Sequence, residues 1–483
     1  MLLPKQGMSK EQVLGKLEDL RQNDVKWRNG KLFGGAFHVS NEMEDVVGDA
    51  FRMYMWDNAL DPRDIQSVLQ MERDVMSIAA AHLGGDDNVV GSFTSGGTES
   101  VLLAVKTARD WSRKHKPHIT EPEIIIPITA HACFHKAAQY FGLKAVVVPV
   151  NTETFAVEAS VIEEAITPNT ILLMGSAPSY AHGTIDPIED IAALALKHDL
   201  LCHVDGCVGG WLLPFFREAG ADVPAFDFSV PGVTSMSMDF HKYAYAAKGA
   251  SIVLYRNPEL RLNQIFTCSG WTGYTIVNPT IQSSKSGGPV AGAWAALNYM
   301  GHDGYLNVAK ELLKTTQEAV AAINATDGLH IMGTPAMCLL AFGSDNLNLF
   351  QLSDSLKERG WSVQPQNRKG DVPESIHLTI NPLNIPNMAP FMDDLQAAVK
   401  EVWDAPKVTD PDLVGGLAAM PADLEMDPET MKGMFAMLGI EGGGIPGRMA
   451  VINEIINVLP TQLADKFLTF YFNELTRYRR DEA

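Results

Sequence analysis

The sequence predicts an α/β protein in which helices cover a parallel sheet. Short apolar runs typical of strands alternate with helix-like patterns between about residues 88 and 256, which is the pattern of a parallel sheet covered by helices. Polar residues stand just after several of these runs. The 483 residues, 46% of them hydrophobic, can bury a large core and form two or three domains.

The elements of this sheet follow in order along the chain. We expect buried strands at 123–129, 144–150, 170–176, 200–205 and 251–256. Apolar residues at helical spacing predict helices at 100–111, 131–142 and 186–199.

Four segments are predicted from composition and pattern. Residues 1–60 form a helical lead-in and residues 61–310 the large domain. Residues 311–405 form a smaller C-terminal α/β domain with strands near 329–333, 337–343 and 375–380. Residues 406–483 form a helical tail, whose apolar helix over 451–472 is interrupted by Pro460. The tail packs either on the body of the chain or on a second subunit.

Charge and composition exclude several classes of function. The net charge of −20 and the absence of a basic run argue against nucleic acid or an anionic membrane as the main partner. The N-terminus lacks the apolar stretch of a signal peptide, and no segment has the length and hydropathy of a membrane span. Five scattered cysteines without a CxxC motif indicate neither disulfides nor a zinc site. We therefore expect a cytoplasmic protein.

Chemistry-bearing residues gather at the carboxyl ends of the predicted strands. The stretch FTSGGTES (93–100), His131, Asp205 and the pair His241–Lys242 all occupy such places. Ligands of open α/β sheets bind outside that edge. This common location is the main functional signal.

Lys242 lies in MSMDFHKYAYAAKG (236–249), a run that is mostly small, apolar or aromatic. One interpretation is a surface lysine whose stem covers apolar groups. The other is a partly buried lysine with a lowered pKa, whose neutral amine acts as a nucleophile.

The other residues at this edge also allow more than one interpretation each. The glycines of FTSGGTES and the following helix start could cradle a phosphate, or Thr98 could simply cap the helix. Asp205 could cap a helix, bind a metal or pair with a protonated ring nitrogen. His131 could stack on an aromatic ring or bond to the start of its helix. No cluster with metal-ligand spacing accompanies them, so we expect no metal.

Pyridoxal 5′-phosphate accounts for all of these residues together. This cofactor needs a lysine, an acid for its ring nitrogen, a phosphate cradle and a stacking partner. Lys242, Asp205, Gly97 with Thr98, and His131 supply them in turn.

At these motifs the chain resembles the group II pyridoxal-phosphate-dependent decarboxylases, most closely the sphingosine-1-phosphate lyase branch. The matching segments include TSGGTES (94–100), AHACFHKAA (130–138), HGTIDP (182–187), HVDGC (203–207) and SSKSGG (283–288). The resemblance, over about residues 20–400, implies fold type I, an aspartate aminotransferase-like α/β fold. Its mainly parallel sheet has helices on both faces, and a smaller C-terminal α/β domain follows.

The resemblance also implies a role for each matched residue. Lys242 would form the Schiff base, Asp205 would pair with the ring nitrogen and His131 would stack on the ring. Gly97, Thr98 and His241 would hold the cofactor phosphate. Ser284 would reach that phosphate from the neighbouring subunit, which implies a homodimer with shared active sites.

The substrate side departs from the family pattern. Lys248 matches a lysine that the lyases use there, and Asn58 is retained. Phe37 replaces a tyrosine, Asp61 a histidine and Lys285 an arginine, and Ile276 occupies the place of another tyrosine. An aspartate in place of a histidine disfavours a substrate phosphate nearby, since like charges repel. We therefore expect an altered substrate site.

The implied activity is that of a lyase that breaks a carbon–carbon bond of an amino acid or amine. The leaving group is either carbon dioxide, as in a decarboxylase, or an aldehyde, as in the sphingosine-1-phosphate lyases. An aminotransferase and a non-catalytic descendant of the family are the alternatives.

Overall fold

The computed structural model describes residues 3–60, 63–403, 405, 409, 411–425, 427–437 and 447–477. Within these residues the largest element is a seven-stranded sheet with the order β1-β7-β6-β5-β4-β2-β3. Only β7 runs antiparallel to its neighbours. The strands are β1 (Val90–Thr94), β2 (Glu123–Pro127), β3 (Lys144–Val148), β4 (Thr170–Ser176), β5 (Leu201–Asp205), β6 (Ser235–Asp239) and β7 (Ser251–Tyr255).

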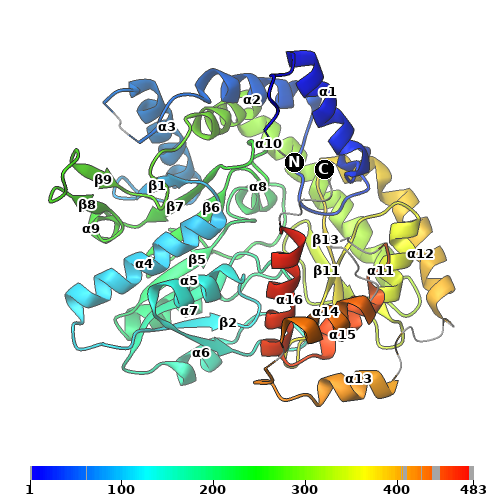
Figure 1. Cartoon of the computed structure of the whole chain (residues 1–483). Coiled ribbons are helices and arrows are strands. Elements are labelled where there is room, and N and C mark those ends of the chain that lie inside the picture. The colour runs from blue at the N-terminus through cyan, green and yellow to red at the C-terminus, as the bar shows by residue number, and fades with distance from the viewer. Residues whose placement is uncertain are drawn as a thin grey trace.

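Helices cover both faces of this sheet, as Figure 1 shows. Ile124 and Ile126 of β2 join the core beneath α4 and α5, whereas Ile125 points into the core of the opposite face. Apolar residues on both sides of one strand are typical of buried parallel sheets. The helices are α2 (Asn41–Tyr54), α3 (Gln66–His82), α4 (Gly97–His115), α5 (Cys133–Phe141), α6 (Ala159–Ala165), α7 (Ile188–Lys197), α8 (Leu213–Glu218), α9 (Pro258–Leu262) and α10 (Gly288–Asn324).

The smaller C-terminal domain contains a four-stranded sheet with the order β10-β11-β13-β12, in which all pairs are antiparallel. Its strands are β10 (His330–Ile331), β11 (Leu339–Gly343), β12 (Gln364–Gln366) and β13 (Ser375–Thr379), and helices α11 (Leu349–Glu358) and α12 (Met388–Trp403) pack with them. α10 crosses the predicted boundary at residue 310 and bends at Gly301, where φ is +57°. The boundary itself stays a prediction.

The described part of the tail packs on its own chain. It contains α13 (Pro411–Ala418), α14 (Pro428–Met437), α15 (Ala450–Val458) and α16 (Thr461–Leu475). The buried Asp354 of α11 accepts hydrogen bonds from the backbone N–H groups of Met449 and Ala450 and so caps α15. The predicted break at Pro460 is confirmed. The sequence allows the tail to pack on the body of the chain or on a second subunit, and in the structure it packs on the body.

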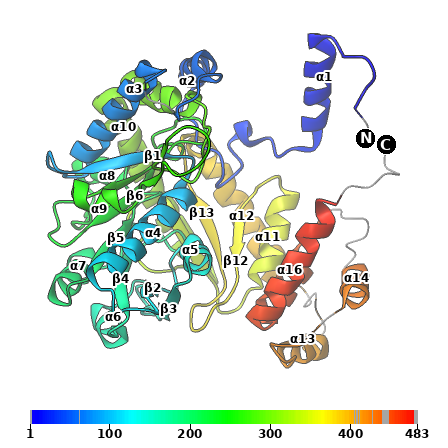
Figure 2. The ribbon, with the colours of Figure 1, turned by 60° about the vertical axis from the view of Figure 1, so that its left-hand side comes forward.

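Two elements extend from the body. α1 (Lys10–Leu20) has no buried residue and stands apart in Figure 2. The hairpin of β8 (Phe266–Cys268) and β9 (Ile276–Asn278) exposes Phe266, Tyr274 and Val277. Across the described residues, none of the helices combines the length and the hydropathy needed to cross a membrane.

Candidate active site

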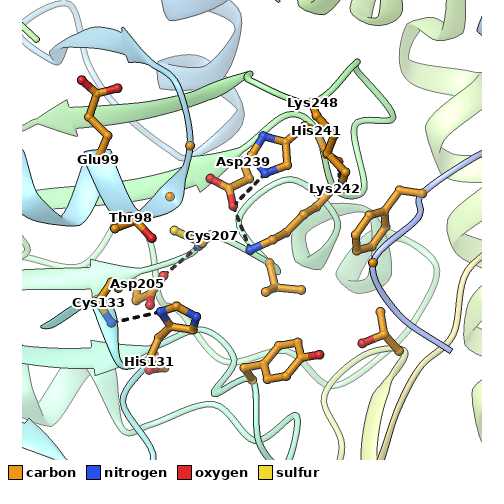
Figure 3. Close-up of a pocket in the computed structure, with 18 of the residues that line it drawn as sticks. Thr98, Glu99, His131, Cys133, Asp205, Cys207, Asp239, His241, Lys242 and Lys248 are labelled. Carbon is orange, nitrogen blue, oxygen red and sulfur yellow. Dashed lines mark hydrogen bonds and ion pairs between the residues drawn. The ribbon is translucent and has the colours of Figure 1, made fainter. Parts of the chain in front are cut away.

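A cavity of about 550 Å³ lies at the carboxyl edge of the large sheet. Its wall includes all the predicted catalytic residues and all the predicted cofactor-binding residues except Ser284. They come together because β1, β5 and β6 end at the same edge, and the segments that follow them turn over it. Figure 3 shows Lys242 pointing toward Asp239 within this cavity.

Lys242 forms an ion pair with Asp239, the last residue of β6. The Lys242 Nζ lies 2.8 Å from Asp239 Oδ2, and the lysine side chain is 24% exposed. Burial alone would lower the pKa of Lys242, but the charge of Asp239 reverses the effect and the pKa is raised. The surface-lysine interpretation is wrong, and so is the expected lowering of the pKa in the protein without its cofactor. Sequence reasoning overlooked Asp239.

The start of α4 forms the predicted cradle. The helix begins at Gly97, and no side chain caps it, so the interpretation of Thr98 as the cap is wrong. Its first N–H groups therefore remain available to an anion, and the helix dipole favours one there. A Cβ added at Gly97 would lie 2.7 Å from Cys207 Sγ and 2.9 Å from Asp239 Oδ2. Only glycine fits this close approach.

Glu99 attaches a distant loop to the cradle. It accepts hydrogen bonds from the N–H and hydroxyl of Ser95 and, 2.7 Å away, from the backbone N–H of Ile281. Ser284 follows in that loop, is exposed and does not line the cavity of its own chain.

Asp205 lines the cavity from the end of β5, and His131 lines it from just before the start of α5. Asp205 Oδ1 accepts a hydrogen bond from the Cys207 N–H at 3.0 Å and lies 3.3 Å from Ser237 Oγ. His131 Nδ1 lies 3.2 Å from the N–H of Cys133 and accepts its hydrogen bond. His131 thus bonds to the start of its helix, as one interpretation has it, and it also lines the cavity. Stacking on an aromatic ring stays a prediction. The neutral ring of His131 then carries the proton on Nε2.

His241 lies beside the cradle and close to Asp239. Its Nε2 is 3.5 Å from Asp239 Oδ2, and its Nδ1 is 3.3 Å from the backbone nitrogen of Ala250, which donates to it. Burial lowers the pKa of His241, although Asp239 opposes the shift. Next along the chain, the Tyr243 hydroxyl donates a 2.8 Å hydrogen bond to the carbonyl of Ile380, just past β13.

The wall next to Lys242 includes two of the predicted substrate residues. Lys248 Nζ lies 5.0 Å from the centre of the Phe37 ring and 3.4 Å from the carbonyl oxygen of His241. Tyr180 and Thr379 also line the cavity, and sequence reasoning missed both. Tyr180 follows β4 closely, so the strand-end rule could have found it. Thr379 comes from the smaller domain, and no local pattern indicates it.

The structure does not place the remaining predicted residues in the cavity. Asn58 forms an isolated bridge with Ser286, and the N–H of Ala59 donates to the carbonyl of Lys285. The segment of Asn58 therefore lies against the loop that carries Ser284. Asp61 lies outside the described residues.

These residues fit pyridoxal phosphate. The uncapped helix start and the glycine cradle suit its phosphate, and the lysine amine suits its aldehyde carbon. Asp205 supplies an acid on the wall for the ring nitrogen, and the cavity is large enough for a cofactor-sized group.

Comparisons with known proteins identify the family of the chain. The model of the pyridoxal-dependent decarboxylase conserved domain matches residues 31–344, and that of a C-terminal putative HTH domain of pyridoxal-dependent enzymes matches residues 411–474. A sphingosine-1-phosphate lyase of Oryza sativa subsp. japonica is 41% identical over 408 residues, which are 83% of this chain and 74% of that protein.

Solved structures show the same fold. The sphingosine-1-phosphate lyase of Burkholderia pseudomallei has a TM-score of 0.80 and 34% identity, over 83% of this chain and 93% of that one. A glutamate decarboxylase of Lactobacillus brevis has a TM-score of 0.75 at 18% identity, over 84% and 96% of the two chains. The chain therefore belongs to the pyridoxal-dependent decarboxylase family and is a pyridoxal-phosphate-dependent lyase.

Proposed function

We propose that this lyase breaks the bond between the amine-bearing carbon and a neighbouring hydroxyl-bearing carbon of its substrate, and that an aldehyde leaves. The similarity to sphingosine-1-phosphate lyases supports this reaction. The similarity to the solved decarboxylase does not support decarboxylation to the same degree, because at 18% identity it is evidence for the fold alone. The observation that carries the proposal is Lys248, an ammonium group on the same cavity wall as Lys242.

We propose that Lys248 binds an anionic group of the substrate, such as a phosphate. The repulsion expected from Asp61 acts only on a phosphate near that residue, which lies outside the described residues. Among the described residues, the Lys248 Nζ has an aromatic neighbour, Phe37, and a weak hydrogen bond to a backbone carbonyl. An ammonium group with so few partners can accept an incoming anion. Phe37 contributes an apolar surface and, unlike a tyrosine, no hydroxyl.

The roles proposed for the other residues follow from their positions. Bound pyridoxal phosphate would draw electrons from the breaking bond into its protonated ring. Lys242 would join the cofactor covalently and hold or move a proton at Nζ. Thr98, Gly97 and His241 would hold the phosphate, and Asp205 would keep a proton on the ring nitrogen. His131 would cover the ring and hold a proton at Nε2.

We also propose that the enzyme acts as a homodimer and in the cytoplasm. Ser284 lies outside its own cavity on an exposed loop, which suits a residue that completes the site of a partner subunit. Met53 and Trp56 are exposed apolar residues close in sequence to Asn58, whose segment lies against that loop. A partner subunit would cover them.

A product assay distinguishes the two lyase reactions. Purified enzyme loaded with pyridoxal phosphate would be given phosphorylated β-hydroxy amines of increasing chain length and, separately, a panel of amino acids. We expect aldehyde from the first group and little carbon dioxide from the second. Lys242→Ala should abolish both the visible band of the bound cofactor and turnover. Faster release of carbon dioxide than of aldehyde would show that the enzyme is a decarboxylase.

A further inference from the structure

Asp239 is a buried carboxylate, and of its two ion-pair partners among the described residues Lys242 is the nearer. Its side chain is 2% exposed, and its Oδ2 accepts from Lys242 Nζ at 2.8 Å. His241 Nε2 is 3.5 Å away. Oδ1 is buried and forms no hydrogen bond to the described residues. A buried carboxylate is tolerated when a charge pairs with it and is costly when that partner is removed.

The same carboxylate forms part of the phosphate cradle. A Cβ added at Gly97 would lie 2.9 Å from Asp239 Oδ2 and 3.0 Å from Oδ1. A negative group at this place repels a phosphate unless a positive group balances it. Lys242 is the balancing charge, and it is also the residue that joins the cofactor.

We propose that Asp239 is a positioning residue that receives the Lys242 ammonium whenever the lysine is not joined to the cofactor. In that state it keeps a proton on Nζ and holds the amine beside the cradle. This inference requires that pyridoxal phosphate is the cofactor. It holds whether the enzyme releases an aldehyde or carbon dioxide.

The electrostatics of the surrounding groups support this role. Burial disfavours the charged form of Lys242, but the negative charges of Asp239 and Asp205 outweigh burial, and the pKa of the lysine is raised. Burial would raise the pKa of Asp239, but the charges of Lys242 and His241 hold it below its ordinary value. Lys248 is a further cation near Lys242 and Asp239, and its charge lowers the pKa of the His241 ring.

The first test measures the reactivity of Lys242 in the enzyme stripped of cofactor. An amine-acetylating reagent would be applied between about pH 7 and pH 10, and modification of the Lys242 peptide followed by mass spectrometry. In Asp239→Asn we expect modification about tenfold faster near pH 8 and a profile shifted to lower pH, since one pKa unit changes the neutral fraction tenfold.

The matched control is Asp205→Asn, which removes a buried carboxylate from the same cavity without removing a hydrogen bond to Lys242. It should change the rate of modification by less than about threefold. Equal rates in Asp239→Asn and the parent protein would overturn the proposal.

The second test measures cofactor affinity without the covalent bond. In the Lys242→Ala background Asp239 is left unpaired, so Asp239→Asn should tighten equilibrium binding of pyridoxal phosphate about tenfold. Asp205→Asn in that background should weaken binding instead. Weaker or unchanged binding with Asp239→Asn contradicts the proposal. If circular dichroism shows that Asp239→Asn is misfolded, Asp239→Ser replaces it in both tests with the same expected results.

Discussion

The Lys248 ammonium lies over the ring of Phe37, with Nζ 5.0 Å from the ring centre. Such a contact stabilises a partly buried cation by about 1 kcal/mol. It is weaker than an ion pair with a carboxylate or phosphate in the same surroundings. The contact thus holds the ammonium in place and leaves it able to bind a substrate anion.

Lys248→Gln should weaken binding of an anionic substrate. Loss of a charge-assisted hydrogen bond costs about 1.5–3 kcal/mol, which corresponds to a KM increase of roughly 10- to 150-fold. Steady-state kinetics with a phosphorylated amine measure this, and the same amine without its phosphate is the control, for which KM should hardly change. Equal effects on both substrates would mean that Lys248 does not bind the anionic group.

The pH dependence of KM should report the charge on Lys248. Burial and the nearby charge of Lys242 hold the pKa of Lys248 below its ordinary value. The ammonium is present below that pKa and is lost as the pH rises through it, so KM for the anionic substrate should rise at a lower pH than an ordinary lysine would cause. In Lys248→Arg the guanidinium stays charged, and KM should be nearly constant over this range. The same rise in both proteins would assign the titration to another group.

Gly97→Ala should disrupt the cradle. The added methyl group would lie within 3.0 Å of Cys207 Sγ and Asp239 Oδ2, so those groups or the helix start must move. We expect the dissociation constant of pyridoxal phosphate to rise by at least about tenfold, which corresponds to about 1.4 kcal/mol. Fluorescence titration of the stripped enzyme measures it.

Gly48→Ala is the matched control for the cradle variant. Gly48 lies in α2, and the nearest neighbour of its added Cβ is the tip of the Arg52 side chain at 4.0 Å. Alanine stabilises a helix relative to glycine, so this variant should bind the cofactor normally and unfold at a slightly higher temperature. If Gly97→Ala bound pyridoxal phosphate as tightly as Gly48→Ala does, Gly97 would not border the cofactor.

Mixing two inactive variants should restore activity if subunits share their sites. Lys242→Ala removes the amine, and Ser284→Trp places a bulky side chain where we propose that the partner subunit's site lies. After equal amounts are unfolded and refolded together, half of the dimers are mixed and each has one intact site, so roughly a quarter of wild-type activity should return. Activity that stays at the level of the separate variants would exclude the shared site.

The sequence predicted the framework of the fold because strongly apolar runs can form buried strands almost independently of their surroundings. The strand expected at 170–176 is β4 in full, and the fold class, the family and the cofactor are confirmed. The sequence does not predict β6 as a strand, because Ser235, Ser237 and Asp239 give it a polar appearance that only burial within the sheet explains.

The site was predictable where residues follow a strand and less so where distant segments meet. Lys242, Asp205 and the glycine cradle all stand at strand ends, so the parallel topology brings them together. Asp239 precedes the His–Lys pair by two residues in the sequence, but its burial and its closeness to Gly97 depend on β6 lying beside α4. Thr379 enters the cavity from a second sheet, which no local pattern reports.

The hydrogen bond from Tyr243 to the carbonyl of Ile380 has a consequence for how small this enzyme can be made. The segment that identifies the family ends at residue 344, before both Ile380 and Thr379. A chain shortened to that segment would keep most of the residues proposed to bind the cofactor. It would lose Thr379 from the cavity wall and the Ile380 carbonyl that accepts the hydrogen bond of Tyr243, the residue after Lys242. We therefore expect the shortest active enzyme to be longer than the segment that the family model matches.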